Sequence, residues 1–480
     1  MKRRITLIIP NSRWFEKRPW LSFPYSALIL SAILKDKYEF SILDANGQNL
    51  DEEGCRKRLS ALSPHVVMVT GGSVEYHRPA HLALAVAKQA CPEAITIMGG
   101  VYPTTLPENA VKDVNADWIF MYHAEERIVP FLELLFAGDM KKAGEFPGIA
   151  FLGANGALVE NPVLHYIADV GKMVKPDYEL VDLNPYLKQT SLDYQFNSDK
   201  PSSFIISSYG CPYNCSFCAS RTISGRKIAY RPAEDVLEEI GYLRDKYGVR
   251  NLVFLDDSLL SDRGRIAAIL NGLIKRKYGL TWKSAAVNAG HLNEELLQLM
   301  KRSGCIQLTI SVESGSQRVL EEVIHKPFRL NIVPGIVKKC RELGIALGAN
   351  FVIGSPGETW DEIRQTFKFA EECDFDVAHF HIATPLPRTN LYRVCVDKGY
   401  LPKDFSFTDP KFFGFGYGFI TTDEFTPVEL SVLRTFEWDR INFSTPEKVK
   451  RVAKLYNTTI ERLKEHRRST RRKFGIHFSS

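Results

Sequence analysis

Short apolar strands alternate with helical stretches along most of this chain, and this alternation constrains its fold more than any other feature. The first series predicts strands at 4–10, 40–44, 65–72, 94–100 and 118–121, with helices between them. Residues 1–140 are therefore predicted to form a doubly wound parallel α/β sheet. Ligands of such sheets bind at the carboxyl ends of the strands. Those ends carry Asp44, Thr70, Gly71, Gly99, Gly100, Tyr102, Glu125 and Glu126.

A second series of alternating elements is predicted over residues 201–400. Its six strands are expected at 204–208, 251–255, 282–286, 307–312, 346–353 and 377–382. A connector, residues 141–200, separates the two series and contains a hairpin signal at Asn155-Gly156. Residues 401–480 read as a helical extension, with helix starts at Thr426-Pro427 and Thr445-Pro446.

Three cysteines stand close together at Cys211, Cys215 and Cys218, directly after the apolar residues 204–206. Thiolates are the usual ligands of iron–sulfur clusters, and three of them can hold a [4Fe-4S] cluster with one iron left open. The alternative, a structural zinc site, normally needs four ligands. The other cysteines are scattered and are expected to pack as small hydrophobic side chains. Free clustered thiols need a reducing compartment.

The C-x3-C-x2-C loop, with the aromatic Phe217 before its third cysteine, resembles the cluster loop of the radical S-adenosylmethionine (SAM) superfamily. The resemblance implies that Cys211, Cys215 and Cys218 bind the cluster and that SAM binds the open iron. It further implies a partial (β/α)6 barrel for residues 201–400, cleavage of SAM to a 5′-deoxyadenosyl radical, and a reductase such as a flavodoxin or ferredoxin.

Further strand ends in this region resemble the SAM-binding segments of the same superfamily. Asp256-Asp257 follows the second strand, although either could instead cap the next helix. The fourth strand leads into Ser311-Val312-Glu313-Ser314-Gly315-Ser316, and the fifth leads into Gly354-Ser355-Pro356-Gly357-Glu358. The alternative for Glu358 is a helix cap. The SAM contacts that the resemblance implies are Phe217, Asp256, Asp257, Ser311, Glu313, Ser314, Ile353 and Gly354.

The loop after the sixth strand is similar to the P-x-P-G-T loop of these enzymes, but Arg388 stands where glycine is common. Arg388 could reach an anionic substrate or SAM, or form a surface ion pair. His379 and His381 alternate onto one face of the sixth strand, where one could donate a proton or both could be core residues.

Residues 1–140 resemble the Rossmann-like cobalamin (B12)-binding domain found ahead of many radical SAM enzymes. The resemblance assigns Asp44, Thr70, Gly71, Gly99, Gly100, Tyr102, Glu125 and Glu126 to cobalamin. No histidine follows two residues after Asp44, so no cobalt ligand is expected from that loop. The alternative is a degenerate domain that binds nothing. Three tyrosines of the connector could meet substrate or cobalt, or simply pack: Tyr178, Tyr186 and Tyr194.

Composition narrows the function classes. The net charge of +6 is too mild to argue for nucleic acid, and no secretory signal is expected, which predicts a cytoplasmic protein. Basic residues 467–473 form either a membrane-surface contact or a solvated helix face. The family implies methylation of an unactivated carbon of an organic or peptide substrate. The alternatives are a related enzyme that forms, contracts or oxidises a ring, a scaffold with a vestigial cluster, and a methylthiotransferase.

Overall fold

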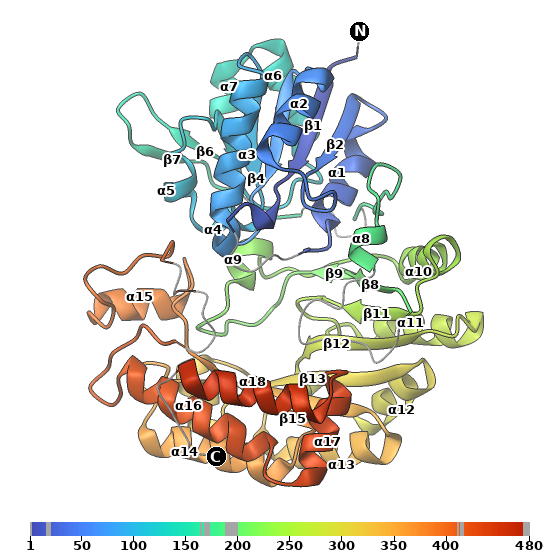
Figure 1. Ribbon diagram of the computed structural model, residues 1–480, viewed down its shortest axis with the longest axis vertical. Coiled ribbons are helices and arrows are strands. Elements are labelled where there is room, and N and C mark those ends of the chain that lie inside the picture. The colour runs from blue at the N-terminus through green and yellow to red at the C-terminus, as the bar shows by residue number, and fades with distance from the viewer. Residues whose placement is uncertain are drawn as a thin grey trace. The chain divides into compact units, whose positions relative to one another are not determined.

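The computed structural model describes residues 2–15, 21–163, 166–167, 173–187, 200–409, 412 and 417–473, and the side chains of 470–473 are not described. The chain forms two compact units (Figure 1). Unit 1 comprises Met1–Gln189 with Thr222–Arg231, and unit 2 comprises Thr190–Arg221 with Pro232–Ser480. The domain limits expected at residues 140, 200 and 400 stay predictions.

Unit 1 is built on a seven-stranded sheet with the order β2-β1-β3-β4-β5-β6-β7. The first five strands in sequence are parallel, and β6 and β7 are antiparallel additions. The strands are β1 (Arg4–Ile9), β2 (Glu39–Asp44), β3 (Val66–Thr70), β4 (Ile95–Gly99), β5 (Trp118–Phe120), β6 (Ile149–Leu152) and β7 (Leu158–Glu160). The predicted doubly wound sheet is confirmed, as is the hairpin at Asn155-Gly156, where Gly156 has φ +73°.

Helices cover both faces of this sheet, which explains why its central strands are apolar on both faces. Ile5, Leu7 and Ile9 of β1 share one core with α1 and α6, whereas α2 and α3 contact β1, β3 and β4. The helical segments are η1 (Ser12–Phe15), α1 (Tyr25–Leu34), α2 (Glu52–Leu62), η2 (Val74–Tyr76), α3 (His77–Ala90), α4 (Val101–Thr105), α5 (Pro107–Ala110), α6 (Ile128–Ala137), α7 (Met140–Gly144) and α8 (Asn184–Leu187).

Unit 2 contains a six-stranded parallel sheet in which every strand pairs with its successor. This order, with β8 and β15 as the outer strands, is that of a partial barrel and confirms the predicted fold. The strands are β8 (Ser202–Ile205), β11 (Asn251–Phe254), β12 (Thr281–Val287), β13 (Cys305–Glu313), β14 (Ala346–Ile353) and β15 (Val377–Ile382). Short strands β9 (Ser208–Tyr209) and β10 (Ala229–Tyr230) and helix α9 (Ser220–Ser224) lie around the cysteine loop in sequence.

The helices of unit 2 begin at side-chain caps in several places. Asp262 caps α11 by accepting from the Arg265 amide, and Thr359 and Glu362 form a capping box at the start of α14. The segments are α10 (Ala233–Tyr247), α11 (Arg263–Arg276), η4 (Ala289–His291), α12 (Glu294–Arg302), the π-helix η5 (Val319–Ile324), η6 (Leu330–Ile332), α13 (Val333–Leu343), α14 (Trp360–Cys373), α15 (Asn390–Asp397), α16 (Pro427–Asn442), α17 (Pro446–Leu455) and α18 (Ile460–Lys473).

The predicted helical extension is present and covers the outer edge of the barrel sheet. The Asn442 side chain of α16 accepts from the Ala378 amide at 2.7 Å and donates to the Ala378 carbonyl at 2.9 Å. Arg434 donates to the Phe380 carbonyl. These side chains satisfy backbone groups that an edge strand would otherwise leave open. None of the described helices is both long and apolar enough to cross a bilayer.

Candidate functional site

The three clustered cysteines lie in one loop at the carboxyl end of β8. Cys211 and Cys215 are half-buried and Cys218 is exposed. Besides burial, Cys211 and Cys218 both raise the pKa of Cys215, and Cys211 also raises the pKa of Cys218, so the three thiols share one neighbourhood. Burial raises the pKa of the Cys215 thiol to about 12, and the Lys326 ammonium opposes that rise. Bound iron would reverse it, because coordinated thiols are deprotonated.

The two aspartates after β11 divide their tasks, and the cap role expected as an alternative for them is wrong. The cap of α11 is Asp262. Asp256 is buried and accepts from the Ser207 and Ser208 hydroxyls at 2.5 and 2.6 Å, so it holds the strand that leads into the loop. Burial raises the pKa of Asp256. Asp257 is exposed and accepts from the Gly210 amide at 2.9 Å, next to the first cysteine.

The second half of the cysteine loop is anchored by its backbone and by Phe217. The Ser216 amide donates to the Ile324 carbonyl at 2.9 Å, and the Ser216 carbonyl accepts from the Leu391 amide at 2.8 Å. Phe217 packs against an apolar cluster that includes Val352 of β14 and Leu391 of α15. Phe217 therefore ties the loop to the barrel.

A buried ion pair stands at the carboxyl end of β13. Glu313 is 6% exposed, has φ +73°, and its carboxylate lies 2.9 Å from the Lys326 ammonium, which is 5% exposed. The sequence prediction included Glu313 but missed Lys326. One signal could have pointed to Lys326. A carboxylate that is buried at a strand end needs a cationic partner.

The serines of the same segment point in different directions. Ser311 lies on β13 opposite Asn350 and is half-buried. Ser314 is fully buried, and its hydroxyl lies 3.2 Å from the Thr366 hydroxyl of α14. Ser314 thus has a packing partner inside the unit, whereas Ser311 stays accessible on its strand.

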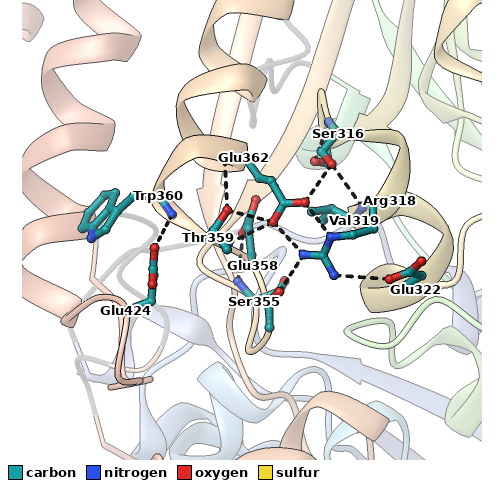
Figure 2. A network of polar contacts seen from close by, with 12 residues as sticks. Ser316, Arg318, Val319, Glu322, Ser355, Glu358, Thr359, Trp360, Glu362 and Glu424 are labelled. Atoms are coloured by element: carbon teal, nitrogen blue, oxygen red, sulfur yellow. Dashed lines mark hydrogen bonds and ion pairs between the residues drawn. The ribbon is translucent and has the colours of Figure 1, made fainter.

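The turn after β14 is held by Glu358, which does not cap the helix as the alternative proposed. One Glu358 oxygen accepts from the Gly354 amide at 2.7 Å and the Ser355 amide at 3.1 Å (Figure 2). Among the described residues the other oxygen has no hydrogen-bond partner. Burial raises the pKa of Glu358 to about 8, so it is protonated at neutral pH. Gly354 has φ +83°, and the preceding Ile353 is fully buried.

Arg318 links the β13 and β14 turns, and the sequence prediction missed it. Its guanidinium donates twice to Glu362 at 2.7 and 2.6 Å and to the Gly357 carbonyl at 2.8 Å (Figure 2). Glu362 also accepts from the Ser316 hydroxyl, and Arg318 first among its partners lowers its pKa to about 2. The two segments predicted to meet SAM are therefore fixed to each other.

His379 and His381 lie on one face of β15, with their rings stacked. Phe380, between them, contacts Phe367 of α14, so the histidines occupy the opposite face of β15. His379 lies 3.4 Å from the Tyr456 hydroxyl, and burial lowers its pKa to about 4, which keeps it neutral. In the following loop Arg388 adopts φ +63°.

In unit 1, Asp44 already has partners. It accepts from the Tyr186 hydroxyl at 2.8 Å and from the Gly47 amide at 2.8 Å, and burial raises its pKa. Tyr186 is thus a packing residue, and Tyr178 is equally buried, whereas Tyr194 lies outside the described residues. A Cβ on Gly47 would lie 2.3 Å from the Asp44 carboxylate, which explains the glycine.

The glycine loops after β3 and β4 pack against each other. The Gly71 amide donates to the Gly99 carbonyl at 2.5 Å, and the Tyr102 amide to the Gly72 carbonyl at 2.8 Å. Gly100 has φ +120°. Tyr102 is fully buried and its hydroxyl lies 2.8 Å from His81, while Thr70 is half-buried at the end of β3. These loops present mainly backbone at the strand ends.

The acidic turn after β5 places Glu125 half-buried and Glu126 exposed. The Glu125 carboxylate lies 3.8 Å from His123. The sequence prediction missed the loop after β1, where Arg13 donates to the Asn46 carbonyl at 2.9 Å. The sheet order reverses between β1 and β3, so this loop stands at the topological switch point, which is the signal that could have found it.

In the described part of the chain, no group of three or more His, Cys, Asp or Glu side chains is placed to hold a metal ion. A cluster spans several irons, so its thiolates need not converge on one point.

The barrel region and most of the chain are similar in sequence to known proteins. Residues 205–370 match the radical SAM superfamily. The chain is 26% identical over 443 residues to cytidylyl-2-hydroxyethylphosphonate methyltransferase of Streptomyces wedmorensis, covering 83% of both chains. It is also 26% identical over 361 residues to the anaerobic magnesium-protoporphyrin IX monomethyl ester cyclase of Rubrivivax gelatinosus, covering 74% of this chain and 63% of the relative.

Solved structures show the same fold. The cobalamin-dependent SAM radical enzyme OxsB with aqua-cobalamin bound matches with a TM-score of 0.73 at 15% identity, over 98% of this chain and 72% of OxsB. The radical SAM methyltransferase TsrM from Kitasatospora setae, with cobalamin and a [4Fe-4S] cluster bound, matches with a TM-score of 0.65 at 18% identity, over 83% and 75% of the two chains.

Proposed function

We propose that this chain is a cobalamin-dependent radical SAM enzyme that methylates an unactivated carbon, and the match of residues 205–370 to the radical SAM superfamily supports this. The observation that carries the proposal is the loop of Cys211, Cys215 and Cys218 at the carboxyl end of the first strand of a partial barrel. The relationship to a methyltransferase over most of both chains supports the same reaction class. The bound cofactors would supply the reducing electron, the adenosyl radical and the methyl group.

The residues of unit 2 fit a cluster and SAM. The three thiols would hold the cluster and leave one iron open. Asp257 is exposed beside the first cysteine and keeps one carboxylate oxygen beyond its bond to Gly210, so it can accept from an ammonium group. Glu313 and Lys326 place one charge of each sign next to the thiols. This zwitterionic pair suits the amino and carboxylate groups of a bound amino acid.

The carboxyl edge of the unit 1 sheet would hold cobalamin. Its glycine loops expose backbone after β3 and β4, and a cofactor can approach such loops closely. The residues we assign to it remain Asp44, Thr70, Gly71, Gly99, Gly100, Tyr102, Glu125 and Glu126. Among them, Asp44 and Tyr102 are buried with partners of their own, so they would act by shaping the loops.

A ring-forming reaction without methyl transfer is the second candidate, and the similarity to a cyclase favours it. In either case the enzyme needs a low-potential electron donor and an organic or peptide substrate, and we expect it to work in the cytoplasm. We expect no nucleic-acid partner. Of the basic residues 467–473, on which a membrane-surface contact would depend, Arg467 forms an ion pair with Asp439. The side chains of Arg471, Arg472 and Lys473 lie outside the described residues.

Anaerobic reconstitution with iron, sulfide and hydroxocobalamin tests the proposal. We expect about four irons and one cobalamin per chain, and loss of the iron in Cys215→Ala but not in Cys91→Ala, a cysteine of unit 1. Incubation with methyl-labelled SAM, a chemical reductant and an extract of the source cells should move label into a product. Protein that takes up iron but no cobalamin would overturn the cofactor assignment. 5′-Deoxyadenosine without labelled product would favour the ring-forming alternative.

A further inference from the structure

A hydrogen bond joins the middle of the cysteine loop to the end of the third barrel strand. Tyr213 lies midway between Cys211 and Cys215, and His291 ends η4, four residues after β12. The Tyr213 hydroxyl lies 2.6 Å from Nε2 of His291, and both residues are half-buried. Neither side chain has a role that the sequence pattern predicts.

The charge states of the two side chains set the direction of this bond. The Tyr213 phenol has one O–H to donate, and a ring nitrogen without a proton can accept it. Burial, followed by the nearby Arg263, lowers the pKa of His291, so its imidazole is neutral. A neutral phenol therefore donates to a neutral imidazole nitrogen. His291 is itself fixed, because Asn288 accepts from the Gly290 amide at 2.9 Å and forms a tight turn.

The backbone anchors of the loop described so far lie outside the segment between the first two cysteines. Gly210, before Cys211, donates to Asp257, while Ser216, after Cys215, bonds to the Ile324 and Leu391 backbones. Within the segment the anchors are side chains: Tyr213 binds His291, and Asn214 accepts from Arg221. The Tyr213 hydrogen bond joins this segment to the residues that follow β12. It therefore fixes the distance of the segment from the carboxyl end of that strand.

We propose that Tyr213 and His291 are a positioning pair that sets the separation of Cys211 and Cys215 and thereby controls how firmly the cluster is held and how easily it is reduced. This inference rests on the cluster assigned in the proposed function. Removing a group that orients metal ligands typically lowers the metal affinity by about 10- to 100-fold. Hydrogen bonding and solvent access around the sulfurs also change cluster potentials.

The experiment uses the full reconstituted chain and four variants. Tyr213→Phe and His291→Leu each remove the bond, His291→Gln keeps an acceptor at that position, and Tyr242→Phe is the control. Tyr242 lies on α10, where its hydroxyl accepts from Lys246. The readouts are the rate of iron release to a chelator, the midpoint potential of the cluster from its electron paramagnetic resonance signal, and the melting temperature of the iron-free protein.

We expect iron release about tenfold faster in Tyr213→Phe and His291→Leu, with a shifted midpoint potential and an unchanged iron-free melting temperature. His291→Gln should recover most of the loss, and Tyr242→Phe should match the original chain. Release rates and potentials equal to those of the original chain would overturn the inference. So would losses that follow only a lower melting temperature, since these would indicate general destabilisation. If the original chain itself bound no cluster, the proposed function would fail first.

Discussion

The strand ends of the two units use the left-handed backbone region in different ways. In unit 1 the turns after β3 and β4 contain Gly72 at φ +45° and Gly100 at φ +120°. In unit 2 the corresponding edge also has glycines in this region, such as Gly354 at φ +83°, but it adds Glu313 at φ +73° and Arg388 at φ +63°. Glycine adopts such angles without strain, whereas other residues pay about 1–2 kcal/mol.

The difference matches the chemistry at each edge. The unit 1 glycines let two loops pack backbone to backbone, which makes a surface of amides and carbonyls; Tyr122 at φ +64° is an exception there. Unit 2 keeps charged side chains at strained positions, and Glu313 is stabilised by its ion pair with Lys326. The carboxyl edge of the unit 1 sheet thus presents mainly backbone groups. The carboxyl edge of the unit 2 sheet places charged side chains beside the cysteines.

The largest expected effect comes from removing the buried ion pair at the charged edge of unit 2. Lys326→Met would leave the Glu313 carboxylate buried without its partner and cost about 3–5 kcal/mol of unfolding free energy. Lys339→Met, which removes an ion pair to Glu294 at the surface, should lower the stability far less, because solvent screens exposed pairs. Thermal unfolding followed by circular dichroism measures both. Adding Glu313→Gln to Lys326→Met should recover part of the loss, and equal melting temperatures for the two lysine variants would contradict this account.

The next largest effect is expected from a substitution in the glycine loops of unit 1. At Gly100, φ +120° and ψ −166° lie in a region open essentially to glycine alone, and a Cβ would approach the Gly71 amide to 3.2 Å. We expect Gly100→Ala to cost about 2 kcal/mol and to weaken cobalamin uptake, measured by gel filtration and absorbance. Gly138→Ala is the matched control, because that glycine has φ +73° and no atoms crowd its Cβ position. A control loss as large as that of Gly100→Ala would show that strain alone, without the close packing, explains the result.

A third effect should appear only in the pH dependence of stability. Burial raises the pKa of Glu358 to about 8, well above that of an unfolded glutamate. The folded chain therefore keeps this proton while the unfolded chain releases it. The contribution of Glu358 is complete at pH values below the unfolded pKa and is lost as pH rises toward 8. Glu358→Gln should remove this slope, so melting temperatures from pH 5 to pH 8.5 should fall less in the variant. Parallel profiles would mean that Glu358 is ionised when folded.

The sequence predicted the frame of both units because strand periodicity and cysteine spacing are local signals. All eleven principal strands expected from the alternation are present, from β1 (Arg4–Ile9) to β15 (Val377–Ile382). The roles of individual acids were harder to predict. The sequence leaves helix capping open for Asp256 and Glu358, but both carboxylates accept from backbone amides of neighbouring turns. Sequence spacing cannot show which residue of an acidic pair faces the loop beside it.

The unforeseen site residues have partners far away in sequence. Lys326 could not be predicted because its role as a partner of Glu313 follows only once Glu313 is known to be buried. Arg318 could not be predicted because its partner Glu362 lies on another helix. Tyr213 was visible in the loop, yet nothing in the sequence joined it to His291. Such pairings depend on the curvature of the sheet, which brings separate strand ends together.

The smallest expected effect tests the strained side of the comparison directly. Arg388→Gly removes the backbone cost of φ +63° but makes the unfolded chain more flexible, so the two terms largely cancel, and the unfolding free energy should change by less than about 1 kcal/mol. If the arginine is kept there for its charge, binding of labelled SAM or substrate turnover should fall while the melting temperature holds. Arg388→Asn, which tolerates the same backbone angle, should show the same separation. A large loss of stability in both variants would instead assign Arg388 to folding and remove it from the charged edge.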